Sequence, residues 1–323
     1  MQSTARPAAI VASRAVRAPQ APALAREGCT LARAGLRRPC PPRPPVQGVE
    51  GVQCRGDVRC GAAAAGVADL ASYYPPKKNG LGKLMAHFRA TVFYVFTVAL
   101  AFPIFAFMLL SHPVQVLFDK YRRRLHHFAN DIWAVVSTLP FYRVQVTGRE
   151  HLPDKDQAVV YVANHQSFMD IYTLFHIARP FKFISKLSIF MIPIVGWSMW
   201  LTGHVPLART DRRSQLKCLK DCQELLEQGC SVLFFPEGTR SADGKMQSFK
   251  KGAFSVAAKV GVPVVPITLE GCGPIMPNKR EGEMYPGRAK ITIHPAIVSK
   301  DANELCEKAR AAVASALPPM LQG

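Results

Sequence analysis

The part of this 323-residue sequence that follows Pro140 predicts an α/β fold. Short apolar runs alternate there with amphipathic segments of helical length, a pattern typical of strands that alternate with helices. Polar and glycine residues directly follow several of the apolar runs, at the positions where α/β proteins tend to keep their chemistry. The chain is long enough to bury a large core, and we find no second domain boundary after Pro140, so we expect one domain here.

Seven segments after Pro140 are expected to form strands. In chain order they are RVQVTG (143–148), AVVYVAN (158–164), FKFIS (181–185), GHVPL (203–207), CSVLFF (230–235), VPVVPITL (262–269) and AKITIH (289–294). The sixth segment contains Pro263 and Pro266. Since proline cannot donate to a ladder of hydrogen bonds, these two residues predict an edge strand, and we assign them no chemistry.

Helices are expected in the gaps between the strands. Gly229 occupies the place of a C-terminal cap between the fourth and fifth strands, and Gly261 does so after residues 251–260. Near the end of the chain, Asp301 and Glu304 have the spacing of a capping box. The apolar face of the helix before Gly229 is predicted to consist of Leu216, Leu219, Cys222, Leu225 and Leu226.

The first sixty residues have the composition of a targeting segment. They contain ten Arg, no Lys and three acidic residues, with abundant Ala and Pro. Such an Arg-rich, acid-poor segment is typical of organelle transit peptides, and it holds too few large apolar groups to offset the entropy of ordering. We therefore predict a cleaved transit peptide over residues 1–60 and a linker over 61–84. An ordinary disordered basic tail is the alternative.

A long uncharged stretch predicts attachment to a membrane. Residues 90–118 contain no charged residue, and the basic cluster YRRRLHH (121–127) lies just beyond them. About twenty apolar residues suffice to cross a bilayer, and basic residues suit anionic headgroups. Pro103 and Pro113 leave open whether the segment crosses the membrane or enters one leaflet as a bent helix pair. We expect a membrane-associating helical segment over residues 85–130, followed by the α/β domain over 131–323.

The composition restricts the partners. The chain carries 41 Lys and Arg against 22 Asp and Glu, a formal net charge of +19, which suits nucleic acid, an anionic membrane or acidic substrates. Because the excess is concentrated in the first sixty residues and beside the uncharged stretch, and no recognition motif is found, we expect no nucleic-acid partner. Buried, reduced thiols without metal-binding spacing are expected at Cys218, Cys222, Cys230, Cys272 and Cys306.

The stretch VVYVANHQSFMDIYTLF (159–175) places His165 and Asp170 at the end of the second strand. Ser167 is expected to cap the following helix, with Asp170 as its third residue. Because helical side chains lean towards the N-terminus, a histidine just outside a helix can meet an aspartate of the first turn. A carboxylate bound to one imidazole nitrogen leaves the other free to accept a proton, so the pair predicts a general base. The alternative is that Ser167 and Asp170 merely cap the helix.

The stretch LFFPEGTRSADGK (233–245) supplies a second motif at the end of the fifth strand. Gly238 allows backbone N–H groups to approach an anion, and Arg240 can bind phosphate oxygens in pairs. The sequence shows no signature of a nucleophilic serine or cysteine beside the histidine. Together the two motifs predict direct attack by the hydroxyl of a phosphorylated substrate.

These motifs resemble those of a known family. NHQSFMD (164–170) resembles the H-x4-D block of the glycerolipid acyltransferases, and FPEGTRS (235–241) resembles their third block. Their second and fourth blocks correspond to GHVPLARTDR (203–212) and VPVVPITL (262–269). The span from about residue 141 to 295 is similar to plastid-type 1-acyl-sn-glycerol-3-phosphate acyltransferases. The resemblance implies a mixed, largely parallel sheet with flanking helices, and a plastid membrane, the inner envelope, as the location.

The resemblance also implies roles for individual residues. His165 is the base that deprotonates the sn-2 hydroxyl of lysophosphatidic acid, and Asp170 holds it. The acyl donor is acyl-ACP, carried on acyl carrier protein, or acyl-CoA, and the product is phosphatidic acid. No metal or organic cofactor is implied. The glycerol phosphate is expected to bind to Arg209, Glu237, Gly238, Thr239 and Arg240, with Lys186 as a further cationic candidate.

Several alternatives stay open. Lys186 is equally compatible with a solvated surface charge, and Arg209 could pair with Asp211 or with lipid headgroups. The segment SIFMIPIVGWSMWLTG (188–203) suits plain core, an acyl-chain tunnel or a membrane-contact surface. Acylation of glycerol-3-phosphate at sn-1, or of another lysophospholipid, would use the same groups. A basic membrane protein that only binds anionic lipid would not require the pair of His165 and Asp170.

Overall fold

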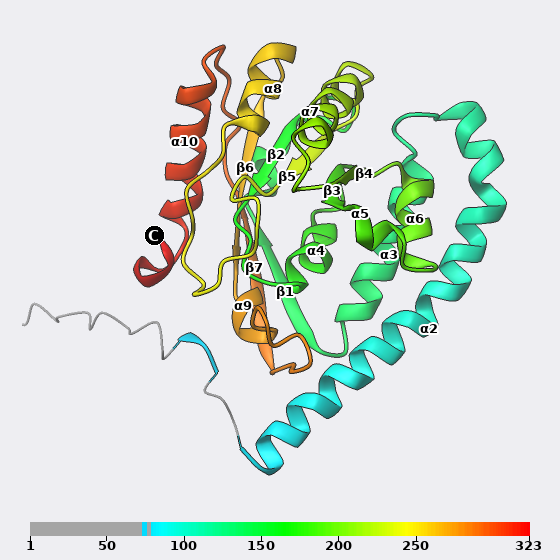
Figure 1. Cartoon of the computed structure of the whole chain (residues 1–323), viewed down its shortest axis with the longest axis vertical. Helices are drawn as coiled ribbons and strands as arrows, with labels where there is room; N and C mark the ends of the chain where they lie inside the picture. The colour runs from blue at the N-terminus through cyan, green and yellow to red at the C-terminus, as the bar shows by residue number, and fades with distance from the viewer. Residues whose placement is uncertain (1–72, 76–78) are drawn as a thin grey trace, which may run out of the picture. The chain divides into compact units, whose positions relative to one another are not determined.

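The structure is a computed structural model, which describes residues 73–75 and 79–323 (Figure 1). The expected transit peptide over residues 1–60 lies outside the described residues, as do residues 61–72 and 76–78 of the expected linker. The described part contains a seven-stranded sheet with helices on both of its faces. The helices are α2 (Leu81–Phe118), α3 (Arg124–Thr138), α4 (Met169–Leu174), α5 (Leu187–Phe190), α6 (Val195–Thr202), α7 (Arg212–Glu227), α8 (Gly252–Val260), α9 (Cys272–Ile275) and α10 (Ala302–Ser315).

All seven predicted strands are present in one sheet. They are β1 (Tyr142–Thr147), β2 (Val160–Ala163), β3 (Lys182–Lys186), β4 (Val205–Leu207), β5 (Val232–Phe234), β6 (Val264–Glu270) and β7 (Gly287–Ile293). Their order is β1-β7-β6-β2-β5-β3-β4, and all pairs of neighbours are parallel except β6 and β7. The prediction of a mixed, largely parallel sheet is therefore confirmed.

The position of β6 corrects one prediction. β6 lies between β7 and β2, so Pro266 does not belong to an edge strand, and Pro263 precedes the strand. The Pro266 carbonyl accepts a hydrogen bond from the backbone N–H of His294 at 3.0 Å. Since the N and C=O of one strand residue point to the same side, the missing N–H faces β7, which ends at Ile293. The missing bond thus falls between the last pair of the β6–β7 ladder, Ile267 with Ile293, and the separate bridge of Val264 with Ile297, so it coincides with a break in the pairing.

Each face of the sheet carries its own hydrophobic cluster. Val159, Tyr161 and Ala163 belong to the cluster that includes residues of α2, α3 and α4. Val160 and Val162, which point to the opposite face, belong to the cluster with α7, α8 and α10. In Figure 1, α8 and α10 lie on one side of the strands and α3 and α4 on the other. β2 is therefore buried on both faces, and its carboxyl end is held firmly in place.

The predicted helix ends are confirmed in part. Gly229 and Gly261 follow α7 and α8 with φ angles of 78° and 79°, as expected for C-terminal caps. Asp301 caps α10, but Glu304 bonds to serine and lysine side chains instead of completing a capping box. The prediction for Leu216 is wrong, because this side chain is 61% exposed. α7 packs against the domain only through a narrower stripe that includes Cys218, Cys222 and Leu226.

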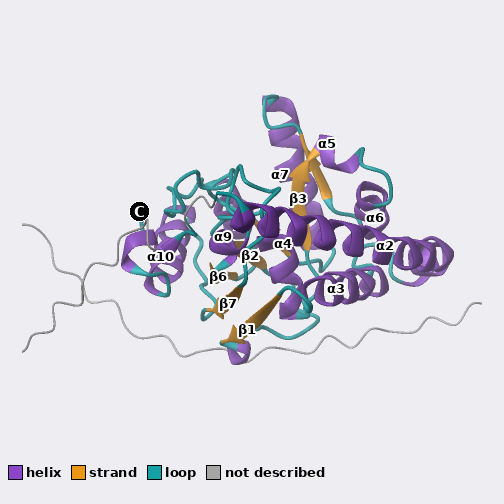
Figure 2. Ribbon diagram, turned by 90° about the horizontal axis from the view of Figure 1, so that it is seen from below, coloured by secondary structure: helices purple, strands orange, loops and turns teal. Residues whose placement is uncertain are grey.

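The uncharged stretch of residues 90–118 lies within α2, which begins earlier, at Leu81, and the rest of the expected segment up to residue 130 falls in the following loop and α3. α2 continues through Pro103 and Pro113, and it is the one helix in the described part of the chain that is long and apolar enough to cross a membrane. α3 packs beside it (Figure 2). The break between the two helices lies at residues 119–123 and not at either proline. Only 22% of the most apolar window of α2 is buried, which leaves an apolar surface suited to membrane association.

A short segment before α2 packs against the α/β domain. The Tyr73 hydroxyl accepts a hydrogen bond from the backbone N–H of Gly271 at 2.9 Å. The Tyr74 ring lies against Gly244 and Gly273, where an added Cβ atom would come within 2.1 Å and 2.5 Å of the tyrosine hydroxyl. The absence of side chains at these two glycines therefore provides the space that Tyr74 fills.

Candidate active site

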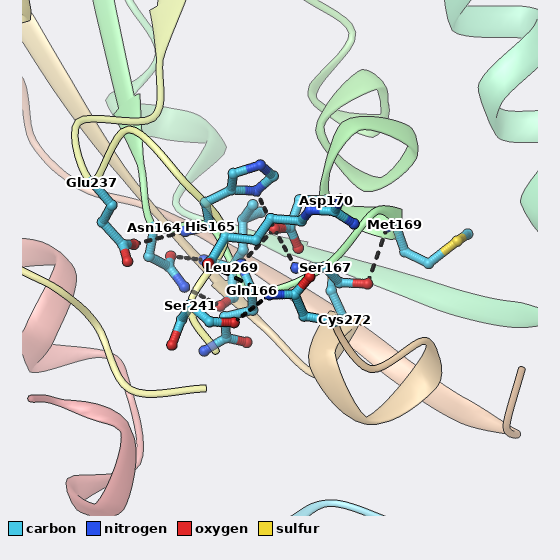
Figure 3. Close-up of polar contacts among 12 residues, drawn as sticks. Asn164, His165, Gln166, Ser167, Met169, Asp170, Glu237, Ser241, Leu269 and Cys272 are labelled. Carbon is cyan, nitrogen blue, oxygen red and sulfur yellow. Dashed lines mark hydrogen bonds and ion pairs between the residues drawn. The ribbon is translucent and has the colours of Figure 1, made fainter. Parts of the chain in front are cut away.

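The two sequence motifs meet because β2 and β5 are neighbouring parallel strands. Their carboxyl ends lie side by side, so the residues that follow them are brought together. The His165 backbone N–H donates to Glu237 at 2.8 Å, and the His165 ring stacks on Phe235 with the ring centroids 4.0 Å apart. Asn164 exchanges two hydrogen bonds with the backbone of Leu269 in β6 (Figure 3). The turn that carries His165 is thus tied to both strands beside β2.

His165 and Asp170 form the predicted pair. The His165 Nδ1–H donates to Asp170 Oδ2 at 2.8 Å, and the backbone N–H groups of Gln166 and Ser167 donate to the same oxygen at 2.7 Å and 2.8 Å (Figure 3). Asp170 is fully buried, whereas the His165 side chain is 13% exposed and lines a cavity. Because Nδ1 is engaged by the carboxylate, Nε2 is the nitrogen that can accept a proton from a hydroxyl.

The sequence left two roles open for Asp170, as the partner of a base or as a helix cap, and its carboxylate makes the contacts of both. Its carboxylate accepts backbone N–H groups just before α4 while it holds His165. The Ser167 hydroxyl accepts from the Met169 N–H at 3.1 Å and donates to the Met276 carbonyl at 2.7 Å. α4 begins at Met169, so Asp170 is its second residue and not its third. The start of the helix therefore fixes the carboxylate that orients the imidazole.

A buried thiol lies behind Asp170. The Cys272 thiol donates to the Thr173 hydroxyl at 3.3 Å, and that hydroxyl also bonds to Tyr142 at 3.0 Å. Burial, together with the nearby charge of Asp170, holds the pKa of the Cys272 thiol well above its usual range. The thiol therefore stays protonated beside the carboxylate. All five described cysteines are unpaired, and four of them are buried as predicted, whereas Cys306 is only half-buried.

His165 faces a cavity of about 710 Å³. Apolar side chains from α2, α3, α4 and α6 line its walls, among them Ile104, Trp133, Ile171 and Met199. Such a volume and lining suit an acyl chain. In the segment 188–203, which the sequence left open, Phe190 and Met199 belong to the hydrophobic core. Met199 lines the cavity, whereas exposed side chains suited to a membrane surface occur at Met191, Trp197 and Trp200.

Four of the predicted substrate contacts line the same cavity. Lys186 ends β3, Arg209 follows β4, and Thr239 and Arg240 follow β5. These three strands are neighbours in the sheet, and they are parallel. Their carboxyl ends therefore bring three cationic side chains to the cavity that contains His165, an arrangement suited to a phosphate group.

Glu237 and Gly238 occupy a different position. The two Glu237 oxygens accept the backbone N–H groups of His165 and Gln247, at 2.8 Å and 3.1 Å, and burial raises the pKa of Glu237 to about 7. The Gly238 N–H donates to the Phe235 carbonyl at 2.9 Å, and its φ of 77° favours glycine. Neither residue lines the cavity, so their contact with substrate stays a prediction. In this structure they shape the turn that presents Arg240.

The sequence did not reveal the loop from Pro277 to Glu283, which lies between α9 and β7. Its residues Asn278, Lys279 and Glu281 line the cavity. The charged sequence PNKREGE resembles that of many solvent-exposed turns, so no local pattern places it beside His165. Only the approach of β7 to β6 in the folded sheet brings the loop to this site.

An α/β domain that holds a histidine–aspartate pair beside an apolar cavity with a cationic rim can activate a hydroxyl group of an anionic lipid. This is the arrangement expected of a lipid acyltransferase. The family described as Acyltransferase matches residues 143–270 of the chain. The chain belongs to the family of 1-acyl-sn-glycerol-3-phosphate acyltransferases, as its sequence motifs predict.

Three relatives support this assignment. A 1-acyl-sn-glycerol-3-phosphate acyltransferase of Chlamydomonas reinhardtii is 54% identical over 288 residues, which cover 89% of this chain and 86% of the relative. The chloroplastic enzyme LPAT1 of Arabidopsis thaliana is 48% identical, with 82% and 74% covered. The crystal structure of the 1-acyl-sn-glycerophosphate acyltransferase PlsC from Thermotoga maritima matches with a TM-score of 0.63 at 30% identity, and covers 72% of this chain and 95% of that chain.

Proposed function

We propose that this protein transfers an acyl group from an acyl thioester to the sn-2 hydroxyl of 1-acyl-sn-glycerol-3-phosphate and so forms phosphatidic acid. The observation that carries the proposal is the bond between His165 and Asp170 in the cavity that also receives Arg240. A base beside a phosphate-binding cation is what a phosphorylated alcohol requires. The names of the relatives agree with this reaction.

The geometry supports a direct transfer. His165 Nε2 accepts the proton of the sn-2 hydroxyl, and the hydroxyl oxygen attacks the thioester carbonyl carbon. Asp170 stabilises the imidazolium that forms, because its carboxylate accepts the Nδ1–H at 2.8 Å. When the tetrahedral intermediate collapses, the carbon–sulfur bond breaks. The imidazolium proton passes to the leaving thiolate, which gives phosphatidic acid and a free thiol.

The polar wall of the cavity suits the phosphate of the substrate, and its apolar walls suit the acyl chain. Lys186, Arg209 and Arg240 supply cations for the phosphate, and Thr239 supplies a hydroxyl donor. The apolar walls from α2, α3, α4 and α6 accommodate hydrocarbon. Glu237 acts indirectly, since its carboxylate binds the backbone of His165 and of Gln247 and so joins the turn after β2 to the loop after β5.

We further propose acyl carrier protein as the donor of the acyl group and the inner envelope membrane of plastids as the location. The Arg-rich, acid-poor composition of residues 1–60 supports a plastid address, as do the chloroplastic relatives from Arabidopsis thaliana and Brassica napus. The exposed apolar surface of α2 supports attachment to a membrane. Acyl-CoA is the alternative donor, since its thioester would react in the same way.

One assay tests the acceptor and the donor together. The purified mature protein is given lysophosphatidic acid, glycerol-3-phosphate or other lysophospholipids, each with acyl-ACP and with acyl-CoA. We expect phosphatidic acid from lysophosphatidic acid, with a higher kcat/KM for acyl-ACP than for acyl-CoA. Faster acylation of glycerol-3-phosphate or of another lysophospholipid would contradict the proposed acceptor, and equal use of both donors would contradict the proposed donor.

A further inference from the structure

The loop from Pro277 to Glu283 places a carboxylate against the arginine assigned to the phosphate. Arg240 Nη1 donates to Glu281 Oε1 at 2.7 Å, and the two side chains are 33% and 35% exposed. Both residues line the cavity that contains His165. An ion pair of this exposure is weak, so a better anion can displace the carboxylate.

Glu281 is held in place by more than its bond to Arg240. The backbone N–H of Lys279 donates to the same Oε1 at 3.2 Å, and the Tyr94 hydroxyl of α2 donates to the Glu281 carbonyl at 2.9 Å. The Asn278 amide donates to the Ser241 carbonyl at 2.8 Å, which ties the loop to the segment that follows Arg240. The carboxylate is therefore positioned by the fold and is not a chance surface contact.

The same loop contains a further basic residue at the cavity. Lys279 lines the cavity and has a φ of 64°, a left-handed conformation that costs free energy for a residue with a side chain. Residues in such conformations persist where the surrounding structure holds them, and they occur often at sites that clamp ligands. Because Lys279 and Glu281 flank one turn of the loop, it presents a cation and a competing anion together.

We propose that Glu281 is an exchangeable counter-ion of Arg240, which the phosphate of the substrate displaces and which displaces the phosphate of the product in turn, and that Lys279 is an additional phosphate contact. This inference rests on the proposed function. Acyl transfer leaves the phosphate monoester unchanged, so the cations that bind the substrate would also retain the product. A carboxylate that returns to Arg240 weakens this retention and promotes product release.

The test compares phosphate-monoester affinity in Glu281→Gln and Lys279→Gln. Inorganic phosphate and dihexanoyl phosphatidic acid are used as inhibitors of acyl transfer in detergent micelles, and KM is measured for both substrates. In Glu281→Gln we expect both inhibition constants and the KM for lysophosphatidic acid to fall by about threefold to tenfold. In Lys279→Gln we expect them to rise by a similar factor. The KM for the acyl donor should change by less than about twofold in either variant.

Two controls separate this mechanism from a general effect of surface charge. Glu307→Gln and Lys300→Gln change exposed residues outside the cavity and should leave both inhibition constants unchanged. If Glu281 acts through Arg240, Glu281→Gln should have less than a twofold effect in an Arg240→Gln background. An undiminished effect in that background would overturn the counter-ion role.

The other outcomes are equally decisive. A higher KM for lysophosphatidic acid in Glu281→Gln would mean that the carboxylate orients Arg240 for the substrate, which contradicts displacement. If Lys279→Gln leaves both inhibition constants and the KM for lysophosphatidic acid unchanged, Lys279 is not a phosphate contact. If the variants change the inhibition constant of inorganic phosphate but not that of dihexanoyl phosphatidic acid, the affected anion site lies away from the lipid phosphate. A wild-type protein that forms no phosphatidic acid refutes the proposed function itself. If the wild type is active but both variants keep its inhibition constants and its KM for lysophosphatidic acid, only this inference is refuted.

Discussion

The substitution Asp170→Asn separates the charge of the carboxylate from its role as a hydrogen-bond acceptor. Asp170 Oδ2 accepts three N–H groups, from the His165 ring and from the backbone of Gln166 and Ser167. An asparagine carbonyl in the same place still accepts from all three, but it cannot stabilise an imidazolium by charge. If the two charge centres are about 4 Å apart and the effective dielectric constant is about 20, the lost interaction is about 4 kcal/mol. This corresponds to a loss of about 10³-fold in kcat.

The effect on stability should be much smaller than the effect on rate. The asparagine amide nitrogen would be buried, at a cost of about 1–3 kcal/mol if it finds no acceptor. For a domain of this size, each kcal/mol lowers the thermal midpoint by about 2–4 °C. The protein should therefore remain folded at the assay temperature, and the loss of rate can be measured on folded enzyme.

The assay is kcat at saturating substrates together with the thermal midpoint, for Asp170→Asn, His165→Ala, the double variant and Ser167→Ala. His165→Ala should lower kcat by about 10²–10⁴-fold, and the double variant should be no slower, because the two residues act as one unit. Ser167→Ala removes the acceptor of the Met169 N–H and the donor to the Met276 carbonyl but leaves the bond between His165 and Asp170 in place, so it should lower stability by about 1–3 kcal/mol with little change in kcat. A folded Asp170→Asn variant that keeps more than about a tenth of the wild-type kcat would refute the role assigned to the pair.

Three further predictions concern the phosphate, a buried acid and the membrane. Arg240→Ala should weaken binding of the lysophospholipid by about 1.5–3 kcal/mol, seen as a raised KM; a rise confined to the KM of the thioester would instead place Arg240 in the donor site. Because burial raises the pKa of Glu237 from 4.5 to about 7, the protonated form is favoured in the folded state. The contribution of protonated Glu237 to stability is full below about pH 4.5 and is lost as the pH rises to about 7. The free energy of unfolding in urea should therefore decline across this range in the wild type, and this decline should be absent in Glu237→Gln. The mature protein should stay with the membrane pellet after carbonate extraction, and its release would exclude the attachment inferred from α2.

The sequence allowed much of the local structure to be predicted, because local patterns are enough to define strands and turns. All seven strands were identified, and the pair of His165 and Asp170 followed from the lean of side chains at a helix start. The order of strands in a sheet depends on distant contacts, so no pattern predicted that β5 lies beside β2. Motifs shared with the family placed the two turns at one site before the sheet order was known.

The errors arose where burial depends on neighbours distant in sequence. Leu216 has the spacing of a buried residue on α7, but the sheet and α8 cover only part of the predicted face. Pro266 suggested an edge strand, and the prediction failed because β6 lies between β7 and β2, with the proline at a break in the pairing. Glu281 and Lys279 were missed because a charged turn is the same in sequence whether it faces solvent or a substrate. The burial of Leu216, the place of Pro266 and the position of this loop all depend on the folded sheet and cannot be read from local sequence.

The contact of Tyr74 with Gly244 and Gly273 limits where the predicted transit peptide can be cleaved. If residues 1–60 are a transit peptide, as predicted, cleavage must occur before Tyr73 for the chain to keep the hydrogen bond to Gly271 and the aromatic ring that fills the glycine-lined space. A recombinant version that begins at Leu81, where the first long helix starts, would lose both and leave an unfilled hollow beside the loop that follows Arg240. Tyr73 and Tyr74 are thus part of the packing of the α/β domain, although they precede α2 in the chain.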